Sequence, residues 1–170
     1  MFTGLCIFKT ELGWLGIVAA DVWIQRTVIG HATKAQILDR LGRHYPRVPA
    51  NECQRLVQRF QNYCSGRKTS LTSLKIEESW MTPFQKRVVA ACRVIPWGET
   101  LTYGQLAEIA GSPRASRAVG TVMARNRYPL IVPCHRVCSN SGIGGFSAPR
   151  GIDLKRRLLA NEGVMELVAV

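Results

Sequence analysis

The chain has 170 residues, of which 46% are hydrophobic, and its mean hydropathy is +0.01. This balance excludes an intrinsically disordered chain, because disordered segments lack the apolar residues that a core needs. The 23 Lys and Arg residues outnumber the 11 Asp and Glu residues and give a net charge of +12. Such a charge favours a polyanionic partner, either nucleic acid or an anionic membrane surface.

The amino terminus shows neither a signal peptide nor a membrane-spanning segment, because Lys9 and Glu11 interrupt its apolar residues. We therefore expect no membrane contact and a cytoplasmic location, or a nuclear one in a eukaryote. The six cysteines are expected to be reduced thiols in such a compartment. None belongs to a paired C-x-x-C pattern, so no metal site is expected.

The first elements along the chain predict a mixture of strands and helices. Apolar runs separated by turn residues predict a β-meander over residues 3–29. A short helix is expected over residues 33–41 with Thr33 as its cap. A longer helix is expected over residues 51–63, where apolar residues recur at helical spacing after Asn51 as a cap.

The amino-acid composition changes over residues 65–79, which are rich in Gly, Ser, Thr and Lys. This segment predicts a linker that holds at most one short strand. We therefore expect an N-terminal mixed α/β domain over residues 1–79 and a second domain over residues 80–170. The residues of the first domain suggest no chemistry, so its expected role is structural support.

Helix start signals dominate the beginning of the second half. Thr82 and Pro83 predict a helix that ends before Pro96. A second helix is expected over residues 102–110, and a third from Ser112 to about residue 125. Two helices joined by so short a turn predict a helix-turn-helix, which commonly places a helix in a groove of DNA. The expected fold class is α+β, with a small β-meander and helix domain followed by a mostly helical, winged-helix-like domain.

The third of these helices carries basic residues beside small ones. Small neighbours leave little bulk around Arg117, so its guanidinium could project beyond the helix surface. A merely solvated basic face is the alternative for any one helix. The turn and the charge of +12 together favour DNA binding.

The last helix is predicted from residue 153 to residue 161. Its leucines, Leu154, Leu158 and Leu159, are expected to face inward, and Lys155, Arg156 and Arg157 to face outward. Glu162 follows the helix at the end where the helix dipole disfavours an anion. We hypothesise that its partner is His135, whose orientation a carboxylate would fix. The alternative is a solvent-exposed Glu162.

The most specific stretch is Pro133-Cys134-His135-Arg136, which follows an apolar run. A thiol becomes a nucleophile only as its thiolate, and a free pKa near ~8.5 leaves most of it protonated at neutral pH. If the segment were a strand, Cys134 and His135 would point to opposite faces, so contact would need a bridging water or a sharp turn at Pro133. The two readings are an activated nucleophile and a buried structural cysteine.

Three segments together resemble the O6-alkylguanine-DNA alkyltransferase family. They are Thr102-Tyr103-Gly104-Gln105-Leu106-Ala107, Ala115-Ser116-Arg117-Ala118-Val119-Gly120 and Ile131-Val132-Pro133-Cys134-His135-Arg136-Val137. The match extends in order over residues 82–163, whereas the N-terminal half resembles the family only loosely, chiefly at residues 10–15.

The resemblance implies direct-reversal repair of duplex DNA. An alkyl (methyl) group would pass irreversibly from O6 of guanine to Cys134 after the nucleotide is flipped out, while O4 of thymine as a second target is left open. On that reading Glu162 holds His135, which deprotonates Cys134 through a water. Tyr103 would protonate the leaving purine and help to rotate the nucleotide, and Arg117 would fill the gap in the stack. One monomer would repair one lesion without any cofactor.

The resemblance also implies roles for residues around this centre. Thr102, Arg114 and Arg136 are expected to contact DNA besides Arg117 and Tyr103. Asn126 would brace the turn, and the guanine pocket would be lined by Asn126, Pro129, Val137, Phe146 and Ser147. Phe146 stands where the family usually has Tyr, and the loop over residues 138–151 departs from the usual pattern. These departures put the pocket lid and the range of alkyl groups in question.

Two other functions compete with this one. A helix-turn-helix regulator or lesion sensor without alkyl transfer explains the charge and Arg117 but leaves Cys134, His135 and Glu162 without a role. A metal site formed by Cys134, His135 and Cys138 lacks a fourth ligand and has unusual spacing.

Overall fold

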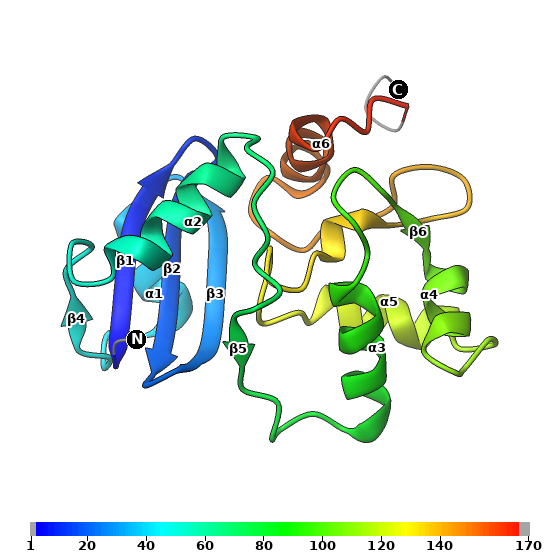
Figure 1. Cartoon of the computed structure of the whole chain (residues 1–170), viewed down its shortest axis with the longest axis horizontal. Helices are drawn as coiled ribbons and strands as arrows, with labels where there is room; N and C mark the ends of the chain where they lie inside the picture. Colours follow the sequence, from blue (N-terminus) through cyan, green and yellow to red (C-terminus); the bar gives the residue numbers. More distant parts are fainter. Residues whose placement is uncertain (1–2, 167–170) are drawn as a thin grey trace.

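The computed structural model describes residues 3–166, in which an N-terminal sheet with two helices lies beside the helices and loops of the second half (Figure 1). The prediction of a meander is confirmed, because β1 (Gly4–Thr10), β2 (Gly13–Ala20) and β3 (Trp23–His31) pair in antiparallel order. Two short strands add to its edges in parallel: β4 (Arg47–Val48) beside β1, and β5 (Lys75–Ile76) beside β3. The order is β4-β1-β2-β3-β5.

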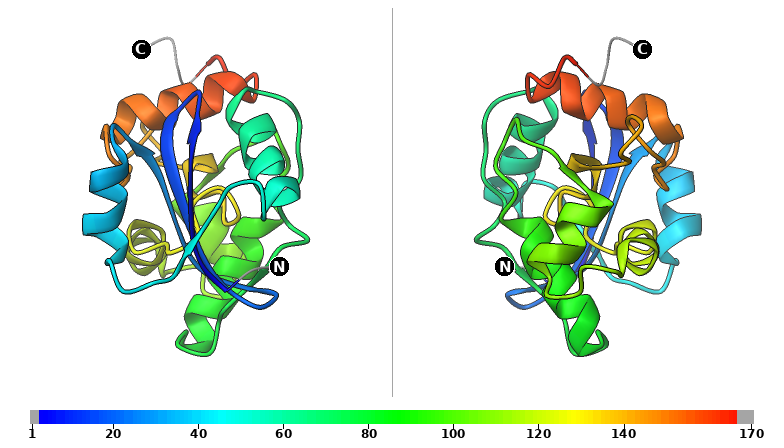
Figure 2. Two further views of the ribbon diagram at one scale, coloured as in Figure 1. Left: turned by 90° about the vertical axis from the view of Figure 1, so that its left-hand side faces the viewer. Right: turned by 90° about the vertical axis from the view of Figure 1, so that its right-hand side faces the viewer.

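Helices cover both faces of this sheet (Figure 2). α1 (Lys34–Leu41) buries Ile37 and Leu41 on one face. It lies so close to β2 that a Cβ on Gly16 would come within 2.5 Å of a methyl group of Ile37. α2 (Gln54–Cys64) covers the other face with an apolar stripe. The predicted helix over 33–41 is therefore confirmed, with Thr33 as its N-cap.

The predicted cap at Asn51 is wrong. α2 begins at Gln54, with Cys53 at its cap position and no capping side chain. The reason is a separate turn just before the helix, in which the amide of Glu52 donates to the carbonyl of Pro49 at 3.1 Å. Asn51 lies within that turn and is exposed.

The second half opens with the predicted helices. α3 (Pro83–Arg93) and α4 (Tyr103–Ile109) each start with a capping box, which Thr82 and Thr102 form with a Gln three residues later. α5 (Ser116–Ala124) packs on α4 and completes the helix-turn-helix. Ser112 as its cap is wrong, because the carbonyl of Ser112 accepts from the amide of Ala115 and closes a turn ahead of the helix.

The segment after α5 is irregular until a short 3-10 helix (Cys134–Arg136). β7 (Val137–Cys138) follows it and pairs in parallel with β6 (Leu101–Thr102). The last helix, α6 (Gly151–Asn161), begins two residues earlier than predicted. None of the helices within residues 3–166 is long and apolar enough to cross a membrane.

One cluster of buried apolar side chains contains residues from both halves, including Phe60 of α2 and Val132 beside the 3-10 helix. The predicted linker contributes β5 to the N-terminal sheet. The division into domains at residue 79 stays a prediction.

Candidate active site

A sharp turn, not a strand, presents Cys134. The amide of Cys134 donates to the carbonyl of Val132 at 2.8 Å, and that of Arg136 donates to the carbonyl of Pro133 at 2.9 Å. Asn126 braces the turn from outside: its Nδ2 donates to the carbonyl of Val132 at 2.8 Å and lies 3.0 Å from Sγ of Cys134. The sulfur is thereby held at the tip of a rigid turn with an amide donor beside it.

Behind the turn lies a buried network centred on Glu162. Its Oε1 lies 2.9 Å from Nε2 of His135 and accepts from the hydroxyl of Tyr63 at 2.6 Å. The guanidinium of Arg136 donates to both oxygens of Glu162, at 2.8 and 2.9 Å. It also donates to the hydroxyl of Tyr63 at 3.0 Å and to the carbonyl of Ile95 at 2.6 Å. Glu162 is therefore not the solvent-exposed residue of the alternative reading.

The network fixes the tautomer of His135. Nε2 faces a carboxylate oxygen, which only accepts, so Nε2 carries the proton. The other nitrogen, Nδ1, is buried and has no hydrogen bond to another described protein atom. In the neutral ring Nδ1 holds the free lone pair, so it is the atom that can take up a proton.

The surroundings keep Glu162 ionised and His135 neutral. Burial would raise the pKa of Glu162, but hydrogen bonds and charges from His135 and Arg136 outweigh burial and lower that pKa to about 2. Burial lowers the pKa of His135, and Glu162 offsets this only in part. The resting state is thus a carboxylate beside a neutral imidazole.

The thiol of Cys134 is protonated in this state. Burial raises its pKa, whereas the hydrogen bond from Asn126 and the charge of Lys155 act in the opposite direction without cancelling it. A base is therefore needed to form the thiolate at neutral pH.

Lys155 is buried, so its predicted outward orientation is wrong. Its ammonium donates to the carbonyl of Val137 at 2.6 Å and to that of Gly145 at 3.3 Å. The carbonyl of Val137 belongs to β7, and that of Gly145 belongs to the loop over residues 138–151. Lys155 thus joins α6 to both segments and adds a positive charge near Cys134. The leucines Leu154, Leu158 and Leu159 are buried as predicted.

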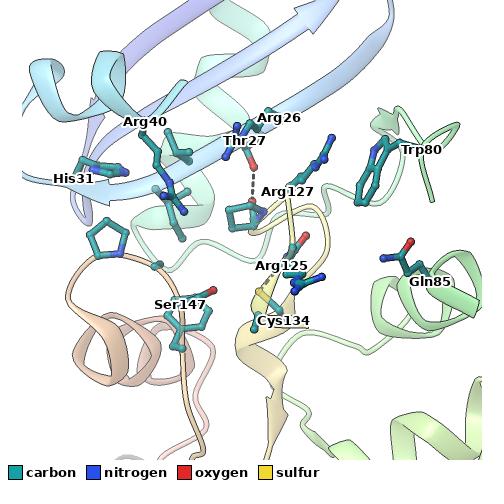
Figure 3. A pocket seen from close by; sticks show the side chains of 18 residues that line it. Arg26, Thr27, His31, Arg40, Trp80, Gln85, Arg125, Arg127, Cys134 and Ser147 are labelled. Atoms are coloured by element: carbon teal, nitrogen blue, oxygen red, sulfur yellow. Dashed lines mark hydrogen bonds between the residues drawn. The ribbon is translucent and has the colours of Figure 1, made fainter. Parts of the chain in front are cut away.

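Two cavities meet at Cys134. The smaller, of about 240 Å³, is lined by Tyr103, Gly120, Phe146 and Ser147. The ring of Tyr103 lies between glycines, since a Cβ on Gly120 or Gly144 would come within 4.0 or 3.5 Å of it. The larger cavity, of about 430 Å³, extends from Cys134 to β3 and α1 of the first half (Figure 3).

The remaining predicted site residues fall in distinct places. Pro129 and Asn126 line the larger cavity. Val137 is fully buried and offers only its backbone. Arg117 is exposed in the first turn of α5, Arg114 is exposed in the turn before that helix, and Thr102 caps α4.

Arg136 as a DNA contact is wrong. Its guanidinium is buried, and Glu162, Tyr63 and Ile95 already occupy its donors. A DNA phosphate would have to displace a buried carboxylate to reach it.

Sequence reasoning missed two residues of this site. Tyr63 comes from the first half, for which no chemistry was expected; its place in the apolar stripe of α2 was the only signal, because a buried hydroxyl needs a partner. Lys155 precedes Leu158 and Leu159 by three and four residues, which places it on the buried face.

The comparisons with known proteins agree with this geometry. A family model described as "6-O-methylguanine DNA methyltransferase, DNA binding domain" matches residues 83–164. A methylated-DNA–protein-cysteine methyltransferase of Shigella flexneri is 32% identical over 164 residues, which cover 93% of this chain and 94% of that protein. The chain belongs to this family.

Other relatives extend the comparison. A methylated-DNA–protein-cysteine methyltransferase of Metallosphaera sedula is 39% identical over 108 residues, which span 64% of this chain and 66% of that protein. The Mycobacterium tuberculosis O6-methylguanine methyltransferase is similar in structure, with a TM-score of 0.77, 30% identity and coverage of 95% of this chain and 93% of that one. A structure of OGT from the same organism in complex with DNA has a TM-score of 0.75 at 28% identity, covering 94% and 92%. The methyltransferase family therefore matches this chain in fold across both halves.

Proposed function

We propose that this protein removes alkyl groups, methyl above all, from O6 of guanine in duplex DNA by transferring them irreversibly to Cys134. The observation that carries the proposal is the position of the Cys134 thiol: it lies in the wall of a cavity that also contains Tyr103, with a buried His135–Glu162 pair behind it. Membership of the methyltransferase family supports the same reaction.

The first step would be formation of the thiolate. Nδ1 of His135 would accept the thiol proton through a water, and Glu162 would stabilise the resulting imidazolium. Asn126 would hold the sulfur in place by its hydrogen bond. The buried Lys155 would favour the negative charge as it forms.

The second step would be a displacement at the alkyl carbon. A bond forms between Sγ and that carbon while the carbon–O6 bond breaks, and its electron pair stays on the purine. Guanine leaves more easily when it is protonated as it departs. Burial raises the pKa of Tyr103, so its hydroxyl keeps a proton to donate. The thioether product does not hydrolyse, which makes each molecule a single-turnover transferase without a cofactor.

Access to O6 would require the nucleotide to leave the duplex, since the reacting atom is stacked inside it. Arg117 is exposed at the start of α5, next to small residues that let the helix approach a groove. We infer that it fills the gap in the stack, with Arg114 and Thr102 near the phosphates. One chain holds every group of the proposed reaction, which supports a monomer. Because the proposed substrate is DNA, we infer that the protein acts in the cytoplasm, or in the nucleus of a eukaryote.

The test is the mass of the intact protein after mixing with duplex DNA that carries O6-methylguanine, followed by peptide mapping. One added methyl group on the peptide that contains Cys134 would support transfer, nucleophile and stoichiometry at once. Retained binding of the lesion without any mass gain would replace the proposal by a lesion-sensing role.

A further inference from the structure

Two cysteines of the first half lie against each other, and neither takes part in the proposed alkyl transfer. Sγ of Cys53, at the cap position of α2, lies 2.7 Å from Sγ of Cys6 on β1. Both are free thiols. In the part of the chain that the structure describes, no other two cysteine sulfurs share a hydrogen bond. Bonded sulfurs lie ~2.0 Å apart, so a small shift would join this pair.

The backbone on both sides holds the two sulfurs in place. At Cys6, β1 pairs with β2 on one side and with β4 on the other. The carbonyl of Cys53 accepts from the amides of Leu56 and Val57 at 2.9 and 3.0 Å, which ties this residue to the first turn of α2. That helix packs on the face of the sheet that buries Cys6 (Figure 1). The contact between the sulfurs therefore belongs to the folded core.

The two thiols differ in their access to solvent. Cys6 is fully buried, whereas Cys53 is 8% exposed and lines a surface groove of about 480 Å³ between the start of α2 and Leu74. Burial, the hydrogen bond from Cys53 and the charge on that sulfur all raise the pKa of Cys6. A small oxidant that enters the groove therefore meets Cys53 first, with the sulfur of Cys6 directly behind it.

We propose that Cys6 and Cys53 are a peroxide-sensitive pair, which closes to a disulfide in the folded protein and ties α2 to β1. An oxygen of the peroxide bonds to Sγ of Cys53 while the O–O bond breaks, which gives a sulfenic acid and water. Sγ of Cys6 then bonds to that sulfur, the S–O bond breaks, and the departing hydroxide leaves as water with the proton of Cys6. Two thiols and one hydrogen peroxide thus become a disulfide and two waters.

The bond strengthens an element that is weakly held at its start. No side chain caps α2, and near its other end the same helix carries Tyr63, which donates to Glu162. The disulfide joins residues 47 positions apart and so restricts the unfolded chain. In a reducing compartment such bonds are usually transient and respond to oxidants. Oxidation therefore stabilises the helix that supplies Tyr63 to the buried network, and this effect does not depend on the proposed alkyl transfer.

The test treats the folded protein with hydrogen peroxide and stops the reaction with catalase. Remaining thiols are blocked with iodoacetamide in denaturant, and the protein is digested with trypsin without reduction. Cleavage after Lys and Arg places Cys6 in the peptide of residues 1–9 and Cys53 in that of residues 48–55. We expect these peptides to be joined, with a mass two hydrogen atoms below their sum. Any other main product overturns the proposal, whether blocked thiols, a sulfinic acid or a bond to a different cysteine.

Thermal unfolding measures what the bond does. The oxidised protein should have a Tm about 5–10 °C above that of the reduced protein. Cys53→Ser removes the pair but leaves a favourable residue at the cap of α2, so this variant should fold and show no such difference. Cys64→Ala removes a buried thiol from the other end of the helix and should keep the difference. A linked peptide without a change in Tm, or a change that persists in Cys53→Ser, overturns the stabilising role.

Discussion

Tyr63 on α2 donates a hydrogen bond of 2.6 Å to Glu162 at the end of α6, across 99 positions of the sequence. The same hydroxyl accepts from Arg136 at 3.0 Å and lies 3.2 Å from Nε2 of His135. One buried phenol from the first half therefore touches every polar side chain of the network behind Cys134. The first half therefore contributes a side chain to the proposed relay, in addition to the structural support that was expected of it.

Replacing Tyr63 by Phe should destabilise the protein and disturb the relay. The change removes a donor to Glu162 and an acceptor for Arg136 while keeping the ring. We expect a loss of about 1.5–3 kcal/mol in the free energy of unfolding, the usual contribution of a hydrogen bond to a charged group. Chemical denaturation measures this, and methyl transfer against pH measures the effect on the relay.

Tyr45→Phe is the matched control for this change. Tyr45 is partly exposed in the same half and packs at the edge of the α1 cluster. Its stability and pH profile should match those of the unaltered protein. If Tyr63→Phe also left both the free energy of unfolding and the pH profile unchanged, the coupling between the halves through this hydroxyl would be refuted.

Replacing Lys155 by Met should raise the pKa of Cys134 and loosen the pocket. The ammonium lowers that pKa, and its loss also leaves the carbonyls of Val137 and Gly145 without their donor. We expect alkylation of Cys134 by iodoacetamide, followed by peptide mapping, to require a higher pH. Stability should fall by about 1–3 kcal/mol, because buried acceptors are left unpaired.

Lys86→Met removes the same charge from the exposed face of α3 and serves as the control. It should change neither quantity. An identical pH dependence of Cys134 alkylation in Lys155→Met and Lys86→Met would show that the buried ammonium does not act on the thiol.

Local rules explain which parts of the fold were predictable. The meander and the starts of α3 and α4 follow from turn residues and capping pairs within a few positions, such as Thr82 and Gln85. Caps failed where a neighbouring turn competed: Asn51 and Ser112 are both good caps by type, but each lies in a turn that precedes its helix. The preference of a residue type for the N-cap position does not show at which of two adjacent turns the helix begins.

The site was predictable in its chemistry and not in its assembly. The thiol, the imidazole and Glu162 could be chosen because their types suit nucleophile, base and orienting acid. The residues alone suggest a sharp turn at Pro133 only as one alternative to a strand, and the bracing role of Asn126 comes from the resemblance. The contact itself, from Nδ2 of Asn126 to the carbonyl of Val132, is made within an irregular segment and follows no local pattern. The place of Tyr63 in the network and the larger cavity beside Cys134 depend on how the two halves pack, which no local pattern encodes.

Replacing Arg117 by Ala should impair repair of duplex DNA far more than reaction with a free O6-alkylguanine base. The side chain is exposed on α5, away from the buried network, so its loss leaves the thiol chemistry intact. On duplex DNA the flipped state would lose the group that fills the stack, which costs a few kcal/mol. We expect a loss of at least about tenfold in the rate on duplex DNA, measured as methyl transfer in single-turnover assays.

Arg55→Ala on the exposed face of α2 removes an equal charge far from the helix-turn-helix and controls for net charge. Equal losses on duplex and free base in Arg117→Ala would rule out the intercalating role and would point to an effect on the pocket instead.

Replacing Glu162 by Gln should weaken the base and flatten the acid dependence of stability. Glu162 raises the pKa of His135, so its loss leaves a poorer base, and methyl transfer should shift to higher pH.

The folded-state pKa of Glu162 is about 2, below its ordinary value of 4.5. A carboxyl with a lowered pKa stabilises the fold above its unfolded pKa and loses that contribution as the pH falls through the folded value. The contribution is on the order of 3 kcal/mol.

Urea denaturation between about pH 6 and pH 2 measures this contribution in the unaltered protein, in Glu162→Gln and in the exposed control Glu52→Gln. The control should keep the full acid loss, whereas Glu162→Gln should be less stable at neutral pH, where Arg136 lacks its partner, and should lose less on acidification. If the pH profile of transfer in Glu162→Gln matched that of the unaltered protein, Glu162 would have no part in activating His135, whatever it contributes to stability.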